Sequence, residues 1–120
     1  MNIRPERVAK AILREVSAIL RDDLKDPRIG FTTITKVEIT PDIRHAQIYY
    51  SVLGNEKQKR STEIALKSAN GFIKTLIGRR LKLRFTPEIA FIVDRSLEHQ
   101  DRIDRLIERI HKEKEQTQDS

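Results

Sequence analysis

The stretch that most constrains the fold runs from Ile64 to Pro87, where apolar residues recur at the spacing of a helix. Its polar positions hold six lysines or arginines and no aspartate or glutamate. An amphipathic helix turns its apolar face to a core and its polar face to solvent or a partner. Asparagine and glycine are poor helix formers, so Ala69-Asn70-Gly71 predicts an interruption. The sequence therefore predicts two helices that meet at an angle, with a basic outer surface.

Positive charge is concentrated in this part of the chain. Residues 57–87 contain nine basic residues and one acidic residue, a net charge of +8. The other residues contain 15 basic and 17 acidic residues, a net charge of −2, so the whole chain of 120 residues carries +6. A solvated face that keeps the protein soluble is the simpler interpretation. The near absence of acidic residues favours a polyanionic partner instead.

The flanking segments predict a single α+β domain. Apolar positions three and four apart predict helices, and alternation of apolar and polar residues predicts strands. The expected elements are a helix over 4–24, strands over 31–40 and 45–53, helices over 56–68 and from 72 to about 80, a strand over 88–93 and a helix over 101–113. The short link between the first two strands predicts an antiparallel pair, and the helical crossover should bring the third strand in parallel to one of them. The helices should stack on one face of this three-stranded sheet.

The same patterns predict where the domain ends and which way individual side chains point. Residues 1–113 should form the domain, and the polar residues 114–120 should form a disordered tail. In the first strand, simple alternation places Phe31 on the same face as Val37, and Ile34 breaks the pattern. In the basic segment, the helical period places Phe72 toward the core.

Catalysis finds little support in the sequence. The three histidines, His45, His99 and His111, are scattered over a strand, a connection and a helix end, and no paired-histidine spacing occurs. The nucleotide-binding patterns GxxxxGK[ST] and GxGxxG are absent, and no carboxylates gather as metal ligands would. We expect no catalytic residue, no metal and no cofactor. The lack of cysteine and of an apolar run of about 20 residues predicts a cytoplasmic protein without membrane association.

Several separated motifs, in the same order, resemble the ribosome-binding factor A family. The matching residues are Lys25 to Phe31 (KDPRIGF), Asp42 and Ala46, Tyr49 to Val52 with Gly54, Ala69 to Ile73, and Thr86 to Ile89 with Phe91 and Asp94. They cover about Arg7 to Ile107, nearly the whole domain. Several ordered pieces are more specific than any one of them alone.

The resemblance implies a fold and a role. Members of the family have a type II KH-like fold, in which an Ala-x-Gly interhelical kink replaces the GxxG loop of KH domains. No two glycines of this chain stand three apart, and Ala69-Asn70-Gly71 lies where the predicted helices meet. Family members bind the immature small (30S) ribosomal subunit and assist its late maturation, including processing of the 5′ end of 16S rRNA. They act without turnover, support growth in the cold, and are linked to a small-subunit assembly GTPase; we expect a monomer.

The resemblance also implies where RNA should bind. Because Gly71 has no side chain, the kink should present backbone N–H groups and Asn70 to a phosphate–ribose chain. The cations around the kink should neutralise phosphates. The expected cations are Lys67, Lys74, Arg79, Arg80, Lys82 and Arg84. For Gly71 a second interpretation stays open, in which it only ends a helix and lets two helices pack closely.

Two other binding roles compete with this interpretation. A general KH-like module for single-stranded RNA needs stacking aromatic residues or an apolar groove. Only Phe72 and Phe85 lie in the basic segment, and Phe72 is predicted inward, which favours folded RNA recognised by shape and phosphate. A surface module for anionic membranes needs large apolar groups exposed beside the lysines, and here the apolar positions are needed for the core.

Overall fold

The computed structural model describes residues 4–118, apart from the side chains of residues 97–101 and 115–118. The predicted α+β class is confirmed, and the elements follow the predicted order. They are α1 (Pro5–Ala18), a π-helical turn η1 (Ile19–Asp23), β1 (Phe31–Ile39), β2 (His45–Leu53), α2 (Glu56–Leu81), β3 (Glu88–Val93) and α3 (Ser96–Gln118).

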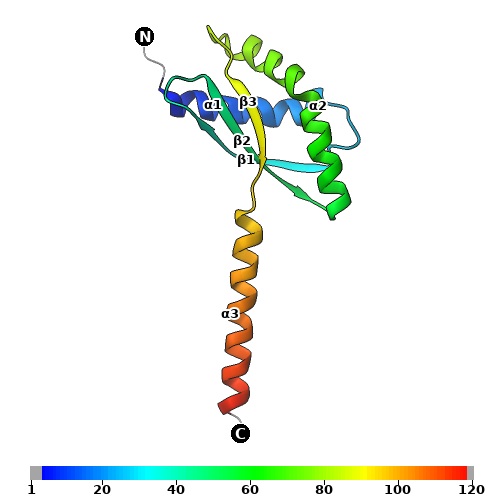
Figure 1. The fold of residues 1–120 in the computed structure, drawn as a ribbon, viewed down its shortest axis with the longest axis vertical. Coiled ribbons are helices and arrows are strands. Elements are labelled where there is room, and N and C mark those ends of the chain that lie inside the picture. Colours follow the sequence, from blue (N-terminus) through cyan, green and yellow to red (C-terminus); the bar gives the residue numbers. More distant parts are fainter. Residues whose placement is uncertain (1–3, 119–120) are drawn as a thin grey trace.

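The three strands form one mixed sheet in the order β1-β2-β3. β1 and β2 are antiparallel, and β3 lies parallel to β2 at the opposite edge. Parallel neighbours need a long crossover connection, which α2 supplies (Figure 1). Both predicted strand relationships are therefore confirmed.

A β-bulge decides which residues of β1 face the core. The register of β1 against β2 shifts between Ile34 and Lys36, which leaves Thr35 as an extra residue. An extra residue reverses the alternation of side chains beyond it. Ile34 and Val37 then both pack on the core side, and Phe31 is 80% exposed. The prediction that Phe31 shares a face with Val37 is therefore wrong.

One core lies between the sheet and the two helices α1 and α2. Its buried side chains come from one stripe of each helix and from one face of the strands. They are Val8, Ile12, Val16 and Ile19 before the sheet, Ile34, Ala46, Ile48, Tyr50 and Ile89 on the strands, and Leu66, Ile73 and Ile77 on α2. Because the buried residues of β2 alternate along the strand, α1 and α2 must cover the same face of the sheet.

α2 is one continuous helix of 26 residues. It begins with a capping box between Asn55 and Gln58 and passes through Ala69-Asn70-Gly71 without a break. The predicted interruption is therefore wrong as a break in the helix, although Figure 1 shows the helix changing direction along its length. The Thr75 hydroxyl donates to the carbonyl oxygen of Gly71 at 2.9 Å. A side-chain bond of this kind commonly bends a helix without ending it.

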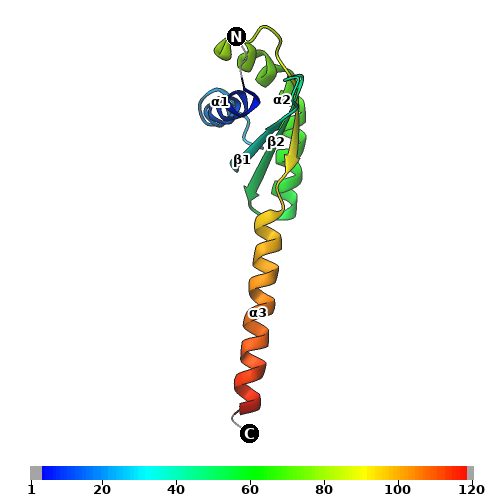
Figure 2. The ribbon, with the colours of Figure 1, turned by 90° about the vertical axis from the view of Figure 1, so that its left-hand side faces the viewer.

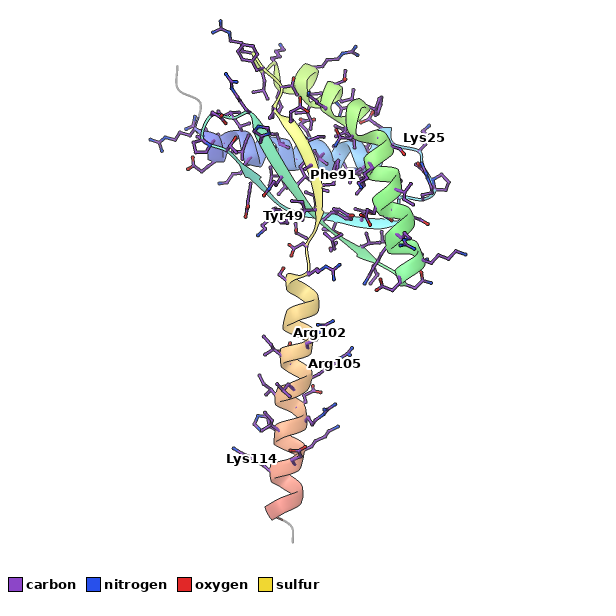
Figure 3. All side chains as sticks on the ribbon, in the orientation of Figure 1. Lys25, Tyr49, Phe91, Arg102, Arg105 and Lys114 are labelled. Atoms are coloured by element: carbon purple, nitrogen blue, oxygen red, sulfur yellow. The ribbon has the colours of Figure 1, made fainter. Side chains whose placement is uncertain are left out.

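α3 projects from the domain as an arm (Figures 1 and 2). The molecule measures 69 × 36 × 18 Å as a result. The helix begins at Ser96, earlier than the predicted residue 101, and continues to Gln118, so residues 114–118 are helical where a disordered tail is predicted. Residues 119 and 120 lie outside the described part of the chain. The side chains of Arg102, Arg105 and Lys114 point outward from this arm (Figure 3).

Candidate nucleic-acid interface

The outer face of α2 carries some of the predicted RNA-binding residues, and Lys82 and Arg84 follow in the loop after the helix. Lys67, Gly71, Lys74 and Gly78 follow one another at spacings of three and four, so they share one face of the helix. Further along, this face borders an open groove. The groove is lined by Gly71, Lys74, Thr75, Gly78 and Arg79 from α2 and by Thr86 from the loop that follows.

Asn70 ties this helix to the sheet. Its side-chain nitrogen donates a hydrogen bond of 3.0 Å to the carbonyl oxygen of Ile89 in the edge strand β3. Because α2 is continuous, the N–H groups of residues 70 and 71 lie inside a helix, where they bond to carbonyls one turn earlier. The predicted presentation of free N–H groups at a kink is therefore wrong. Asn70 keeps its side-chain oxygen and the second hydrogen of its side-chain amide for a partner molecule.

Lys74 is paired within the protein. Its ammonium group donates to the carboxylate of Glu88, the first residue of β3. This hydrogen bond and the positive charge of Lys74 lower the pKa of Glu88 below its ordinary value. Glu88 thus neutralises part of the positive charge of Lys74. The sequence of the basic segment does not show this, because Glu88 directly follows the segment.

Arg80 faces α1 and η1 rather than the outer surface. Its guanidinium group lies 2.7 Å from the carboxylate of Asp23 and 3.5 Å from that of Glu15. The hydrogen bond to Asp23, followed by weaker contributions that include Glu15, raises the pKa of Arg80. The helix continues through Arg80. The side chain extends toward α1, so its charged end stays near solvent. Arg80 therefore fastens α2 to the first helix.

Four of the predicted cations have no ion pair with any described side chain. Lys67, Arg79, Lys82 and Arg84 are all exposed, and the four are called the free cations below. Lys82 caps α2 in the left-handed conformation, with φ 51°. This conformation ends the helix and begins the loop that connects it to β3.

Two aromatic side chains of the basic segment are exposed. The prediction that Phe72 points inward is wrong, since it is 50% exposed and lies about 100° around the helix from the buried Ile73. Phe85, in the loop between α2 and β3, is 74% exposed. The guanidinium carbon of Arg84 lies 5.6 Å from the centroid of the Phe85 ring. The basic surface therefore includes exposed aromatic rings.

The two glycines of the groove play different roles. A Cβ atom on Gly78 would collide with the hydroxyl of Thr86, so this glycine lets the following loop pack directly on α2. A Cβ atom on Gly71 would meet no atom within 4 Å, and its φ is not positive. The interpretation of Gly71 as a close-packing residue is therefore wrong, because no described residue from another element comes within 4 Å of that position.

Other kinds of site are not formed by the part of the chain that the structure describes. In that part, no three histidine, aspartate or glutamate side chains are grouped as they would be around a metal ion. None of the described helices combines the length and the apolar character needed to cross a membrane.

Comparison with known proteins gives consistent matches. A family model described as ribosome-binding factor A matches residues 4–107. The ribosome-binding factor A of Staphylococcus epidermidis is 46% identical over 111 residues, which cover 92% of this chain and 96% of that protein. The protein of the same name from Geobacter sulfurreducens is 49% identical over 111 residues, which cover 92% of this chain and 94% of the relative.

Solved structures show the same fold. The crystal structure of ribosome-binding factor A from Thermus thermophilus matches with a TM-score of 0.58 and 22% identity, over 77% of this chain and 93% of that one. A homology model of the Thermus thermophilus protein, fitted into a cryo-electron microscopy map of a 30S complex, matches with a TM-score of 0.56 and 23% identity. That match covers 77% of this chain and 92% of the other.

Proposed function

The chain belongs to the ribosome-binding factor A family, and from that premise we propose that it binds the small ribosomal subunit through the outer face of α2. The Thermus thermophilus relative has been placed in a map of a 30S complex, which supports this partner. The RNA of the subunit, 16S rRNA, is the polyanion that the basic segment suits.

The observation that carries the proposal is the set of free cations. Lys67, Arg79, Lys82 and Arg84 lie on α2 and the loop after it, within a segment that has no acidic residue. Solvated cations without a carboxylate partner in the protein can exchange their counterions for phosphates, which is the main source of affinity for nucleic acids. Arg80 and Lys74 are engaged within the protein, so they contribute less to this exchange.

The biological role follows from the family. We infer that the protein acts in the cytoplasm on free small subunits, assists late maturation that includes processing of the 5′ end of 16S rRNA, and matters most for growth in the cold. It acts by binding, without turnover or cofactor, as a monomer, and a small-subunit assembly GTPase promotes its release. Sedimentation of the tagged protein in a cell extract tests this role, because it should migrate with free small subunits and be absent from polysomes.

A general module for single-stranded RNA remains the second candidate. The exposure of Phe72 and Phe85 favours it, since rings beside cations are what such modules use. Sedimentation separates the two candidates, because a general module would follow RNA of every kind rather than free small subunits.

The decisive experiment removes the free cations. Replacing Lys67, Arg79, Lys82 and Arg84 together by alanine should weaken binding to purified small subunits. The slope of log K against log salt should fall by roughly 3, since each phosphate contact contributes about 0.7–0.9. Arg80 is left in place because it fastens α2 to α1.

The matched control removes four cations from α3, where charges are mixed. The variant with Arg102, Arg109, Lys112 and Lys114 replaced by alanine loses the same charge and should keep both its affinity and its salt slope. Equal losses from the two variants, or wild-type binding by the first one with its fold intact, would overturn the proposal.

A further inference from the structure

We propose that Phe85 is a stacking platform for an unpaired nucleobase of the bound RNA; this inference rests on the proposed function and deepens it. Phe85 lies in the loop of residues 82–87 between α2 and β3. Its side chain is 74% exposed, although a ring of this size is ordinarily covered in a folded domain.

The loop holds the ring in a fixed position. Leu83, two residues earlier, packs against the core, and Pro87, two residues later, is fully buried. Thr86 sits over Gly78 of α2, where a larger residue would collide with it. Phe85 is therefore the exposed point of a segment that is anchored on both sides. A side chain held in this way loses little freedom on binding, which favours affinity.

The surroundings of the ring suit a nucleotide. The guanidinium group of Arg84 lies over the ring at 5.6 Å from its centroid. Among the described residues, no second ring or cation lies against Phe85, so the ring remains accessible to a flat partner. A base can stack on the ring while its phosphates meet Arg84 and the nearby Lys82, both of which belong to the free cations.

Exposure alone does not make such a platform, as Phe31 shows. Phe31 is 80% exposed, but it lies opposite Leu53, which is equally exposed, across the β1–β2 pair. Arg28 and Lys57 line the same hollow as Phe31, and Arg28 is held by the carboxylate of Asp26. Phe31 therefore belongs to an apolar pair, whereas Phe85 has a guanidinium group over its ring.

The partner must include a base that is free to stack. Bases inside a duplex are already stacked on both faces, so an aromatic side chain on a loop can reach only a base in a single-stranded loop, bulge or end. The site therefore selects unpaired nucleotides of the RNA, in addition to the phosphate contacts of the free cations.

The first test measures binding of Phe85 variants to purified small ribosomal subunits. Phe85→Ala should weaken binding roughly 5- to 150-fold, which corresponds to the range found for base–aromatic stacking. The slope of log K against log salt should stay unchanged, because no charge is removed. Phe85→Leu, which keeps an apolar side chain, should bind as weakly as Phe85→Ala. The matched variant Phe31→Ala should bind like the wild type.

A second test uses fluorescence. The chain contains no tryptophan, so Phe85→Trp introduces a single reporter that can still stack. This variant should bind subunits like the wild type, and a single-stranded octanucleotide of uridine should quench its fluorescence more than an eight-base-pair RNA duplex does. Phe31→Trp should respond to neither RNA.

Each outcome decides the proposal. Wild-type binding by Phe85→Ala or by Phe85→Leu would overturn the stacking platform, and so would equal quenching of Phe85→Trp by both RNAs. Those results would leave the proposed function intact, provided that the variant without the free cations still loses binding. Failure of the wild type to bind subunits would instead refute the proposed function itself.

Discussion

α2 and α3 are both long helices with an apolar stripe, yet they have different surroundings. The stripe of α2 is buried against the sheet and α1. The stripe of α3, formed by Ile103, Leu106, Ile107 and Ile110, is exposed along the arm. The outer face of α2 is basic, whereas α3 mixes both signs of charge. An apolar stripe thus predicts that a helix forms, but it does not reveal whether another element covers that stripe.

The largest expected effect tests the buried and exposed stripes directly. Ile73→Ala on α2 removes a fully buried side chain and should lower the free energy of unfolding by about 2–5 kcal/mol. Ile107→Ala on α3 removes a side chain that is 47% exposed and should change it by less than about 0.5 kcal/mol. Urea denaturation of both variants checks this, and similar losses would mean that the stripe of α3 is covered in solution.

Smaller effects are expected at the two glycines of α2, and the two substitutions should change the stability in opposite directions. Gly71→Ala should stabilise the protein by about 0.5–1 kcal/mol, because alanine favours a helix interior and the space around Gly71 is open. Gly78→Ala should destabilise it by about 1–3 kcal/mol, because the new methyl group collides with Thr86. Thermal melting distinguishes the two. A loss of stability at Gly71 would show that its side of α2 is covered after all, unlike the open surface of α3.

A weaker effect is expected where α2 is fastened to α1. Arg80→Ala should lower the melting temperature slightly, because Asp23 and Glu15 lose their common partner. The neighbouring Arg79→Ala removes the same charge from the outer face, where no described side chain pairs with it, and should leave the melting temperature unchanged. If both variants have the same melting temperature, the Arg80 ion pairs do not stabilise the protein.

A pH-dependent effect is expected at the base of α3. The Asp94 carboxylate accepts hydrogen bonds from the hydroxyl of Ser96, the hydroxyl of Thr35 and, at 2.9 Å, the amide of Ser96. These bonds lower the pKa of Asp94 from 3.8 to about 2. Because the pKa of Asp94 is lowered by folding, its ionised carboxylate stabilises the folded state at pH values above the ordinary pKa of 3.8. This contribution to stability is lost as the pH falls toward about 2.

NMR spectroscopy can follow the protonation of Asp94 in the folded protein. The signals of Thr35 and Ser96 should titrate with a midpoint near the lowered pKa of about 2 rather than near the ordinary value of 3.8. Asp94→Asn should abolish that dependence. Identical pH profiles in the variant and the wild type would show that Asp94 does not hold the base of the arm.

Local patterns predicted most of the fold, and the failures have definite causes. Alternation in β2 and the helical spacing of apolar residues in α2 were sufficient to predict those elements. The bulge at Thr35 reversed the alternation of β1, and α2 accommodated Asn70 and Gly71 without breaking because Asn70 bonds to β3. Pairing of Arg80 and Lys74 depends on Asp23, Glu15 and Glu88, which lie outside the basic segment. No pattern within the basic segment could reveal those partners, so it could not separate free cations from paired ones.

The parallel placement of β3 beside β2 also determines how the chain folds in time. Thirty-four residues separate the end of β2 from the start of β3. Bringing the two strands together costs chain entropy before the stabilising contacts between them can form. Beyond its base at Asp94, α3 is held mainly by bonds between neighbours along the chain, and a helix of this length relaxes within about a microsecond. Refolding should therefore show a fast rise in helical signal from the arm, followed by the slower completion of the sheet.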